Sequence, residues 1–274
     1  MRIDRKTLTL DQRWSLADYL AKENLPKVNT ICINVTPKNG IYAKYIKRFI
    51  DIVVSLIGIL LTLPVNIIIG IITYFDVGKP LFFRQTRIGK NGIPFEIVKF
   101  RNMKDTRDER GELLPASQRV TKFGRFVRKT SLDELLNFWY VLKGDMSIIG
   151  PRPLLNEYVS RYSDRHKARL AVRPGLECPP RELNKPVRSW NDQFENDVWY
   201  VENVSFKTDI IMCIRLIQFA FDRKNTEARS SVSGKGIFMG YNEQGKAINL
   251  DEIPQELIDK WYMDTIKNKE VADK

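Results

Sequence analysis

The longest apolar stretch of the chain covers residues 52–75, which contain no charged side chain. A helix needs about 20 mainly apolar residues to cross the hydrocarbon core of a membrane, so this stretch is long enough. Pro64 lies near its middle, where it removes a backbone hydrogen bond and kinks a helix. The pattern therefore predicts a membrane helix that is broken at Pro64.

Cations lie on both sides of this stretch. Lys47 and Arg48 precede it. Lys79 and Arg87 follow it. Because lysine and arginine are enriched on cytoplasmic flanks, both flanks are assigned to one side of the membrane. A re-entrant helix, which enters and leaves by the same leaflet, satisfies both flanks, whereas a bitopic helix with a proline kink is the alternative. At the mouth of the segment, Asp51 is expected to pair with Lys47 one helical turn back.

Hydrophobic periodicity and turn residues predict the other elements. A strand is expected at 93–103, where period-two alternation puts Lys99 and Arg101 on one face, as a phosphate site or as a solvated edge. Residues 121–128 interleave cations and aromatics, which suits the membrane interface or nucleic acid, and the neighbouring membrane segment favours the interface. Helices are predicted at 11–22, 132–143, 154–172, 206–221 and 254–266.

These elements predict an α/β fold. It is a small, helix-rich, membrane-associated domain with a re-entrant membrane helix, a short sheet and amphipathic helices on its surface. Four parts are expected along the chain. They are a polar N-terminal extension at 1–40, the re-entrant helix at 41–76, a cytoplasmic catalytic domain at 77–224 and a C-terminal extension at 225–274.

Two adjacent carboxylates, Asp133 and Glu134, open one predicted helix. One interpretation is a capping box, in which Ser131 and Glu134 satisfy each other's backbone N–H groups. The other is chemistry on an anion, because a helix N-terminus also binds phosphate. Arg128 precedes the pair, and Arg152 is held between two prolines that restrict its backbone. These neighbouring cations favour phosphate chemistry.

The amino-acid composition indicates which classes of partner the chain could bind. With 45 Lys and Arg against 33 Asp and Glu, the formal net charge is +12, which indicates an anionic partner without choosing among nucleic acid, lipid and phosphorylated small molecules. No nucleic-acid recognition motif is present. The three cysteines are widely spaced and predict neither a zinc site nor a disulfide framework. The single histidine, His166, is expected on the surface or in packing more often than in catalysis.

Six motifs occur in a fixed order along the chain. They are KRFID at 47–51, FRQTRIG at 83–89, KFRNM at 99–103, SLDEL at 131–135, GDMSIIGPRP at 144–153 and RPG at 173–175. With these motifs the chain resembles the monotopic phosphoglycosyl transferases, the bacterial sugar transferase family, from about residue 44 to 224. Such enzymes lie in the bacterial inner membrane and face the cytoplasm through a re-entrant helix.

The resemblance implies transfer of a phospho-sugar from a UDP-sugar to polyprenyl (undecaprenyl) phosphate, with release of UMP. Asp133 would form the covalent phosphosugar intermediate and bind Mg²⁺. Lys99, Arg128 and Arg152 would neutralise the phosphoryl oxygens. Glu134 would position the metal or handle a proton, and either role stays open. Membrane lipids and downstream glycosyltransferases are further expected partners, and nucleic acid is not.

One segment departs from the family pattern. After RPGL the family commonly continues with a TGWAQV-like stretch and an NGR, whereas residues 177–186 read ECPPRELNKP. Candidates for donor specificity are therefore Arg173, Glu177, Arg181 and Lys185. The departure also motivates an alternative function, a catalytically silent relative that binds polyprenyl phosphate or partner glycosyltransferases.

Overall fold

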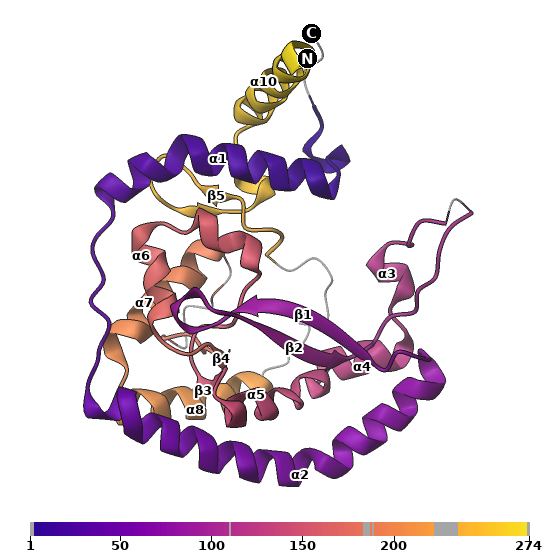
Figure 1. The fold of residues 1–274 in the computed structure, drawn as a ribbon, viewed down its shortest axis with the longest axis vertical. Helices are drawn as coiled ribbons and strands as arrows, with labels where there is room; N and C mark the ends of the chain where they lie inside the picture. Colours follow the sequence, from indigo (N-terminus) through magenta and orange to yellow (C-terminus); the bar gives the residue numbers. More distant parts are fainter. Residues whose placement is uncertain (1–2, 110, 183–186, 188, 222–234, 273–274) are drawn as a thin grey trace.

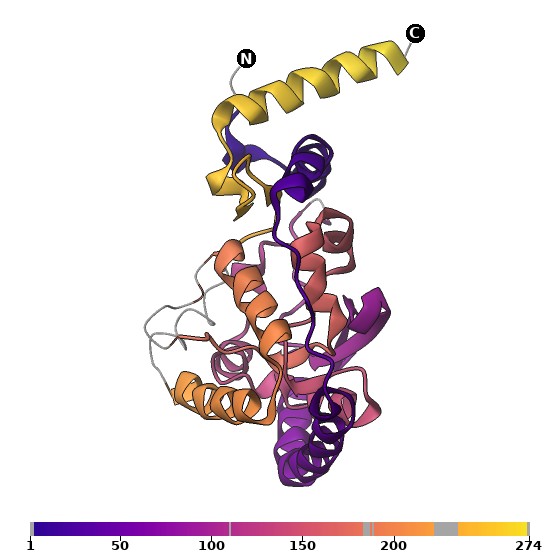
Figure 2. The same cartoon turned by 90° about the vertical axis from the view of Figure 1, so that its left-hand side faces the viewer.

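The computed structural model is helix-rich, as predicted, and its described part contains three two-stranded sheets (Figure 1). Long helices lie at the two ends of the molecule in both views, with α2 at one end and α1 with α10 at the other (Figures 1 and 2). The sheets and shorter helices lie between them. The structure describes residues 3–109, 111–182, 187, 189–221 and 235–272.

The apolar stretch forms helix α2 (Lys47–Asp76), which follows a π-helical turn (Tyr42–Ile46). Helix and turn together are long and apolar enough to cross a membrane, by length and composition. The chain stays helical through Pro64, so the predicted break is a bend, because proline removes one hydrogen bond without ending a membrane helix. Both ends of the bent helix turn toward the rest of the protein (Figure 1).

Side chains at the start of α2 fasten it to the body. Arg48 donates to the carbonyls of Val141 at 2.6 Å and Leu142 at 2.7 Å, near the end of α5 (Asn137–Lys143). The buried Asp51 accepts from the Ser147 hydroxyl and from the Ile148 N–H, both at 3.0 Å.

The predicted pair of Lys47 with Asp51 is wrong. Lys47 instead binds Asp209 at 2.7 Å, and the same carboxylate accepts from the hydroxyls of Tyr42 and Tyr200. Asp51 is engaged by β3 rather than by its own helix. Tertiary contacts therefore replace the local pair.

The first sheet is an antiparallel hairpin of β1 (Phe82–Ile88) and β2 (Pro94–Phe100), joined by a short turn (Lys90–Gly92). The predicted strand at 93–103 therefore ends earlier. Arg101 lies beyond it and binds Asp105 at 2.6 Å, whereas Lys99 binds Glu134. The two cations do not share an anion site along one strand face.

Short helices follow the hairpin: α3 (Ala116–Arg119), α4 (Lys122–Lys129), a 3-10 turn (Leu132–Glu134) and α5 (Asn137–Lys143). The single helix predicted at 132–143 is therefore two elements. The capping box is also wrong, because Ser131 has a left-handed backbone with φ 55° and its side chain does not cap the turn. Gly144 ends α5 with φ 103°, a left-handed conformation that glycine adopts readily.

The second sheet pairs β3 (Ser147–Ile149) with β4 (Gly175–Glu177) in parallel. Between them, the predicted helix at 154–172 is three short elements, because Ser163 caps a new helical start through His166 N–H. These elements are a 3-10 helix (Asn156–Arg161), α6 (Asp164–Lys167) and a further 3-10 turn (Ala168–Ala171).

Two helices complete the body, α7 (Trp190–Asn203) and α8 (Phe206–Phe221). The predicted helix at 206–221 matches α8. Large apolar side chains on one side of α8 are exposed, at Phe206, Ile210, Ile214 and Ile217. Their spacing gives the helix an uncovered apolar stripe.

The two terminal extensions pack together, and we call residues 3–31 with 235–272 the terminal lobe. Helix α1 (Leu10–Ile31) is longer than the predicted 11–22, and its Thr9 forms a capping box with Gln12. The C-terminal part contains β5 (Gly240–Tyr241), β6 (Ala247–Ile248), a 3-10 turn (Leu250–Glu252) and α10 (Gln255–Ala272). Its shared core includes Leu16, Leu20, Met239, Ile258 and Trp261.

An aromatic cluster joins the terminal lobe to the body. Phe238 and Tyr241 of the lobe pack with Tyr162 and Phe194 of the body. His166 is buried there, 2.8 Å from the Tyr241 hydroxyl and 3.0 Å from Glu195. The packing role expected for this histidine fits its position.

A close approach between two glycines fixes the pairing of β3 with β4. A Cβ added at Gly175 would lie 2.1 Å from the backbone nitrogen of Gly150, so Gly175→Ala must push the strands apart. We expect a loss of about 1–3 kcal/mol in the free energy of unfolding, measured as a lower thermal midpoint in detergent. Gly40→Ala is the control, because its added Cβ meets nothing within 4 Å. Equal midpoints for the two variants would refute the steric argument.

Candidate active site

Four segments that lie apart in the sequence bring the predicted site residues together. Lys99 precedes the last residue of β2, and Arg128 lies in the last turn of α4. Asp133 and Glu134 occupy the 3-10 turn that follows α4. Arg152 follows β3, in the loop that contains two prolines.

The carboxylate of Glu134 joins two of these segments. Its Oε1 accepts from Lys99 Nζ and from Arg152 Nη2, each at 2.7 Å. Burial alone would raise the pKa of Glu134, but Arg152 and Lys99 outweigh it and lower that pKa to about 2. Glu134 is therefore ionised at neutral pH, and its lone pairs are directed at cations.

Arg152 extends this network toward β4. Its Nη1 donates to Glu177 Oε2 at 2.7 Å, so the guanidinium lies between two carboxylates, which raise its pKa. Its backbone carbonyl accepts from Arg169 at 2.7 Å, and Arg169 forms a buried ion pair with Asp197 of α7. Arg152 is thus held at both its side chain and its backbone.

Asp133 lies next to Glu134 in a different environment. Its side chain makes no ion pair among the described residues, and only 7% of the residue is exposed. Burial raises the pKa of Asp133, the nearby Lys99 and Arg128 lower it, and the Glu134 charge raises it further; the net shift is upward. A buried carboxylate that forms no ion pair attacks an electrophile more readily than a paired carboxylate does.

Arg128 is the second cation beside Asp133. Burial lowers the pKa of Arg128, and the Asp133 charge opposes that shift. In the part of the chain that the structure describes, its guanidinium forms no ion pair. It is therefore available to an anionic ligand placed at Asp133.

Arg87, near the end of β1, is a site residue that the sequence prediction missed. Burial and the charge of Arg152 lower its pKa, and its buried Nε has no hydrogen-bond partner among the described residues. Its Nη2 donates to the neutral Gln85 at 2.6 Å. Two adjacent guanidiniums repel each other unless an anion lies between them. Strand alternation offered a signal, since it puts Arg87 on the opposite face from Arg84.

The four candidates for donor specificity do not lie together in the structure. Glu177 joins the cluster through Arg152. Arg173 donates instead to the Gly144 carbonyl at 2.9 Å, at the end of α5. Arg181 is exposed and lies 3.7 Å from Glu182, and Lys185 falls outside the described residues. The structure therefore brings one of the four to the catalytic cluster.

The residues present set limits on a magnesium site. In the described ranges no group of three or more His, Cys, Asp or Glu side chains could hold a metal. Glu134 and Glu177 are engaged by cations, whereas Asp133 is not. Mg²⁺ commonly binds through one or two carboxylates plus substrate phosphates and water. The site thus fits a magnesium ion that a diphosphate brings with it and that Asp133 contacts.

Comparisons with known proteins agree with this cluster. The family model for Bacterial sugar transferase matches residues 42–223. EpsL of Bacillus subtilis (strain 168), described as an uncharacterized sugar transferase, is 41% identical over 170 residues, which are 62% of this chain and 84% of EpsL.

Two relatives carry more specific names. A UDP-N-acetylgalactosamine-undecaprenyl-phosphate N-acetylgalactosaminephosphotransferase of Aeromonas hydrophila is 33% identical over 186 residues, covering 65% of this chain and 44% of its own. The UDP-glucose:undecaprenyl-phosphate glucose-1-phosphate transferase of Escherichia coli (strain K12) is 38% identical over 160 residues, covering 56% and 34%. The chain thus spans less than half the length of these two relatives.

The family predicted from the six motifs is confirmed. The matched region runs from the turn before α2 to just beyond the end of α8, so it includes the membrane helix and every residue of the charged cluster. The terminal lobe lies outside it. Since the family model matches more than half of the sequence, this chain belongs to the bacterial sugar transferase family.

Proposed function

We propose that the protein transfers a sugar phosphate from a UDP-sugar to polyprenyl phosphate and releases UMP, as the first step in assembling a bacterial surface glycan. The observation that carries this proposal is the position of Asp133, which is buried and forms no ion pair among the described residues, beside Lys99 and Arg128. The names of relatives from Aeromonas and Escherichia support the same reaction class.

Catalysis would proceed in two displacements. An oxygen of Asp133 attacks the phosphorus bound to the sugar, the bond from that phosphorus to the UMP oxygen breaks, and UMP leaves with the electron pair. An oxygen of the lipid phosphate then attacks the same phosphorus and displaces the Asp133 carboxylate. Splitting the transfer lets two bulky substrates use one site in turn.

Three cations would offset the negative charge of the reacting phosphates. Arg128 and Arg87 have no carboxylate at ion-pair distance among the described residues, so each can bind phosphoryl oxygens without losing a protein partner. Arg152 is held by Glu134 and Glu177, which fix its orientation before substrate arrives. Preorganised cations of this kind stabilise charge that develops in the transition state.

Glu134 would act as a positioning residue. With a pKa of about 2 it carries no proton at neutral pH, so its role is to orient Lys99 and Arg152 rather than to transfer a proton. Magnesium, bound through the donor diphosphate and Asp133, would supply further charge neutralisation on the phosphoryl oxygens.

The same site must reach a lipid substrate, so we propose that α2 enters and leaves the inner membrane from the cytoplasmic face. Its bend at Pro64 and the docking of Arg48 and Asp51 support that arrangement. Exposed Trp139 and Phe126 and the apolar stripe of α8 would lie against the lipid. Downstream glycosyltransferases would take the product.

Replacing the nucleophile tests the reaction. Asp133→Asn should lower UMP release from UDP-sugars, with Mg²⁺ and undecaprenyl phosphate, by at least about a thousandfold. The folded state raises the pKa of Asp133, so its ionised form destabilises the fold above that pKa. The variant should therefore keep or raise the thermal midpoint at pH 7. If the wild-type protein is inactive with every donor, the catalytically silent alternative is favoured. Full activity in Asp133→Asn would refute the assignment of Asp133 as the nucleophile.

The pH profile tests the environment of Asp133. Because its pKa is raised, kcat/KM should rise with pH along an acid limb that lies above the usual value of about 3.9 for aspartate. Arg128→Gln removes a charge that lowers this pKa, so the limb should move to higher pH. Lys104→Gln, which removes an exposed cation, should leave the limb in place. An unchanged limb in Arg128→Gln would contradict the assignment.

Arg87 can be tested against a neighbour on the same strand. Arg87→Gln should lower kcat/KM by about 10–100-fold, because one charge-assisted hydrogen bond to phosphate contributes about 1.5–3 kcal/mol. Arg84→Gln is the matched control, since its pair with Glu96 is exposed to solvent and contributes little. If the two substitutions lower kcat/KM equally, the proposed role of Arg87 in binding phosphate is wrong.

A further inference from the structure

The terminal lobe contains a cleft of about 250 Å³ whose charged lining residues are mostly basic. Four cations line it: Arg5 from the N-terminal 3-10 turn, Lys6 beside it, Arg13 from α1, and Lys235 from the start of the C-terminal part. Among the described residues that line this cleft, Asp251 is the only acidic one. Three separate segments therefore bring like charges to one place.

The protein itself does not neutralise these four cations. Arg5 donates to the backbone carbonyl of Asp251 at 2.6 Å, and Arg13 donates through Nε to the carbonyl of Leu8 at 3.0 Å. These contacts orient the two guanidiniums and leave other N–H groups on each. In the ranges that the structure describes, none of the four forms an ion pair with a carboxylate. Like charges gathered without counterions favour an anionic ligand.

Lys235 is partly buried, and its ammonium donates to the neutral side chain of Gln193 at 2.9 Å. Burial lowers its pKa to about 8, the charge of Arg152 adds to that shift, and nearby carboxylates, Asp197 first among them, oppose it. A phosphate beside Lys235 would stabilise the ionised form, which burial disfavours.

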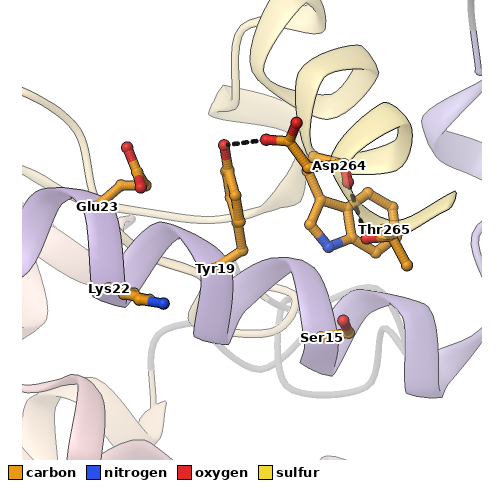
Figure 3. A pocket seen from close by; sticks show the side chains of 7 residues that line it. Ser15, Tyr19, Lys22, Glu23, Asp264 and Thr265 are labelled. Atoms are coloured by element: carbon orange, nitrogen blue, oxygen red, sulfur yellow. Dashed lines mark hydrogen bonds between the residues drawn. The ribbon is translucent and has the colours of Figure 1, made fainter. Parts of the chain in front are cut away.

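The cleft lies in the terminal lobe, and its Lys235 reaches toward α7 of the body. Figures 1 and 2 place α1 and α10 at the end opposite the membrane helix, so a lipid headgroup held by the same bilayer does not reach it. A second cleft on the lobe, between α1 and α10, differs in charge: Lys22 lies there with Glu23 and Asp264, and Tyr19 donates to Asp264 at 3.1 Å (Figure 3). The excess of positive charge is thus particular to the first cleft.

We propose that the basic cleft of the terminal lobe binds the phosphate groups of a soluble phosphorylated molecule, at a second site distinct from the catalytic cluster. Its volume is below the roughly 300–1,000 Å³ of sites that enclose a whole drug-sized ligand, so it suits one or two phosphates with the rest of the molecule outside. The cleft also lies outside the matched family region, so the site belongs to this chain's own extensions.

Pyrophosphate is the probe, titrated calorimetrically into full-length protein in neutral nanodiscs at fixed ionic strength. We expect a class of sites that survives Arg128→Gln at the catalytic cluster. In that background, Arg13→Gln should weaken this class about tenfold or more, since each charge-assisted hydrogen bond is worth about that factor. Lys22→Gln removes a charge from the same helix outside the cleft and should leave the affinity unchanged.

Each contrary outcome identifies a different error. Loss of all pyrophosphate binding in Arg128→Gln, or equal affinity in Arg13→Gln, would overturn the second site. If Lys22→Gln lowers the pyrophosphate affinity as much as Arg13→Gln does, the binding reflects general surface charge and not the cleft. Binding that appears only with anionic lipid in the nanodisc would assign the phosphate to a headgroup instead. Assays of UMP release test the proposed function separately from this second site. A protein that releases no UMP but still binds pyrophosphate through Arg13 would refute the proposed function and leave the second site standing.

Discussion

The carboxylate of Glu134 holds the active-site cluster together. Through one oxygen it binds Lys99, which comes from the hairpin, and Arg152, which comes from the loop after β3. Taking three charged groups partly out of water is costly, and only mutual pairing at hydrogen-bond distance offsets that cost. Without Glu134, Lys99 would have no carboxylate partner among the described residues, and Arg152 would keep only Glu177. The carboxylate therefore sets where the positive charge of the site lies.

Two neighbouring carboxylates acquire opposite properties from this arrangement. Glu134 takes the two cations at hydrogen-bond distance and has a pKa of about 2, whereas Asp133 is buried with no ion pair among the described residues and its pKa is raised. Environments that move two pKa values apart commonly divide chemical roles between them. In the proposed mechanism, Glu134 has a structural role and Asp133 is the reactive carboxylate. The destabilisation carried by Asp133 is the kind of local cost that functional sites retain.

The sequence predicted the features that depend on local pattern. The apolar run gave α2, the apolar pattern of 206–221 gave α8, and ordered motifs placed Asp133, Glu134 and Arg152 in one site. It failed where a side chain had a choice of partners. The capping-box interpretation had Glu134 bind its own turn, but it binds cations 18 and 35 residues away. Lys47 likewise passes over Asp51 for Asp209, 162 residues away. A partly buried charged side chain binds the partner that best offsets its desolvation cost. That partner is set by the three-dimensional fold and cannot be predicted from neighbouring residues in the sequence.

The short strand β3 couples the membrane helix to the phosphate site. At its start, Ser147 and Ile148 donate to Asp51 of α2, and just after its end Arg152 binds Glu134. Its pairing with β4, where Gly150 meets Gly175 at close range, also places Glu177 against the same guanidinium. These contacts link the position of Arg152 to that of α2. In the proposed reaction, the depth of the helix in a membrane would set how far the cations of the site lie from the bilayer surface. A lipid phosphate held at headgroup level would reach Asp133 only if that distance stays constant, and the buried Asp51 and the two close glycines would hold it so.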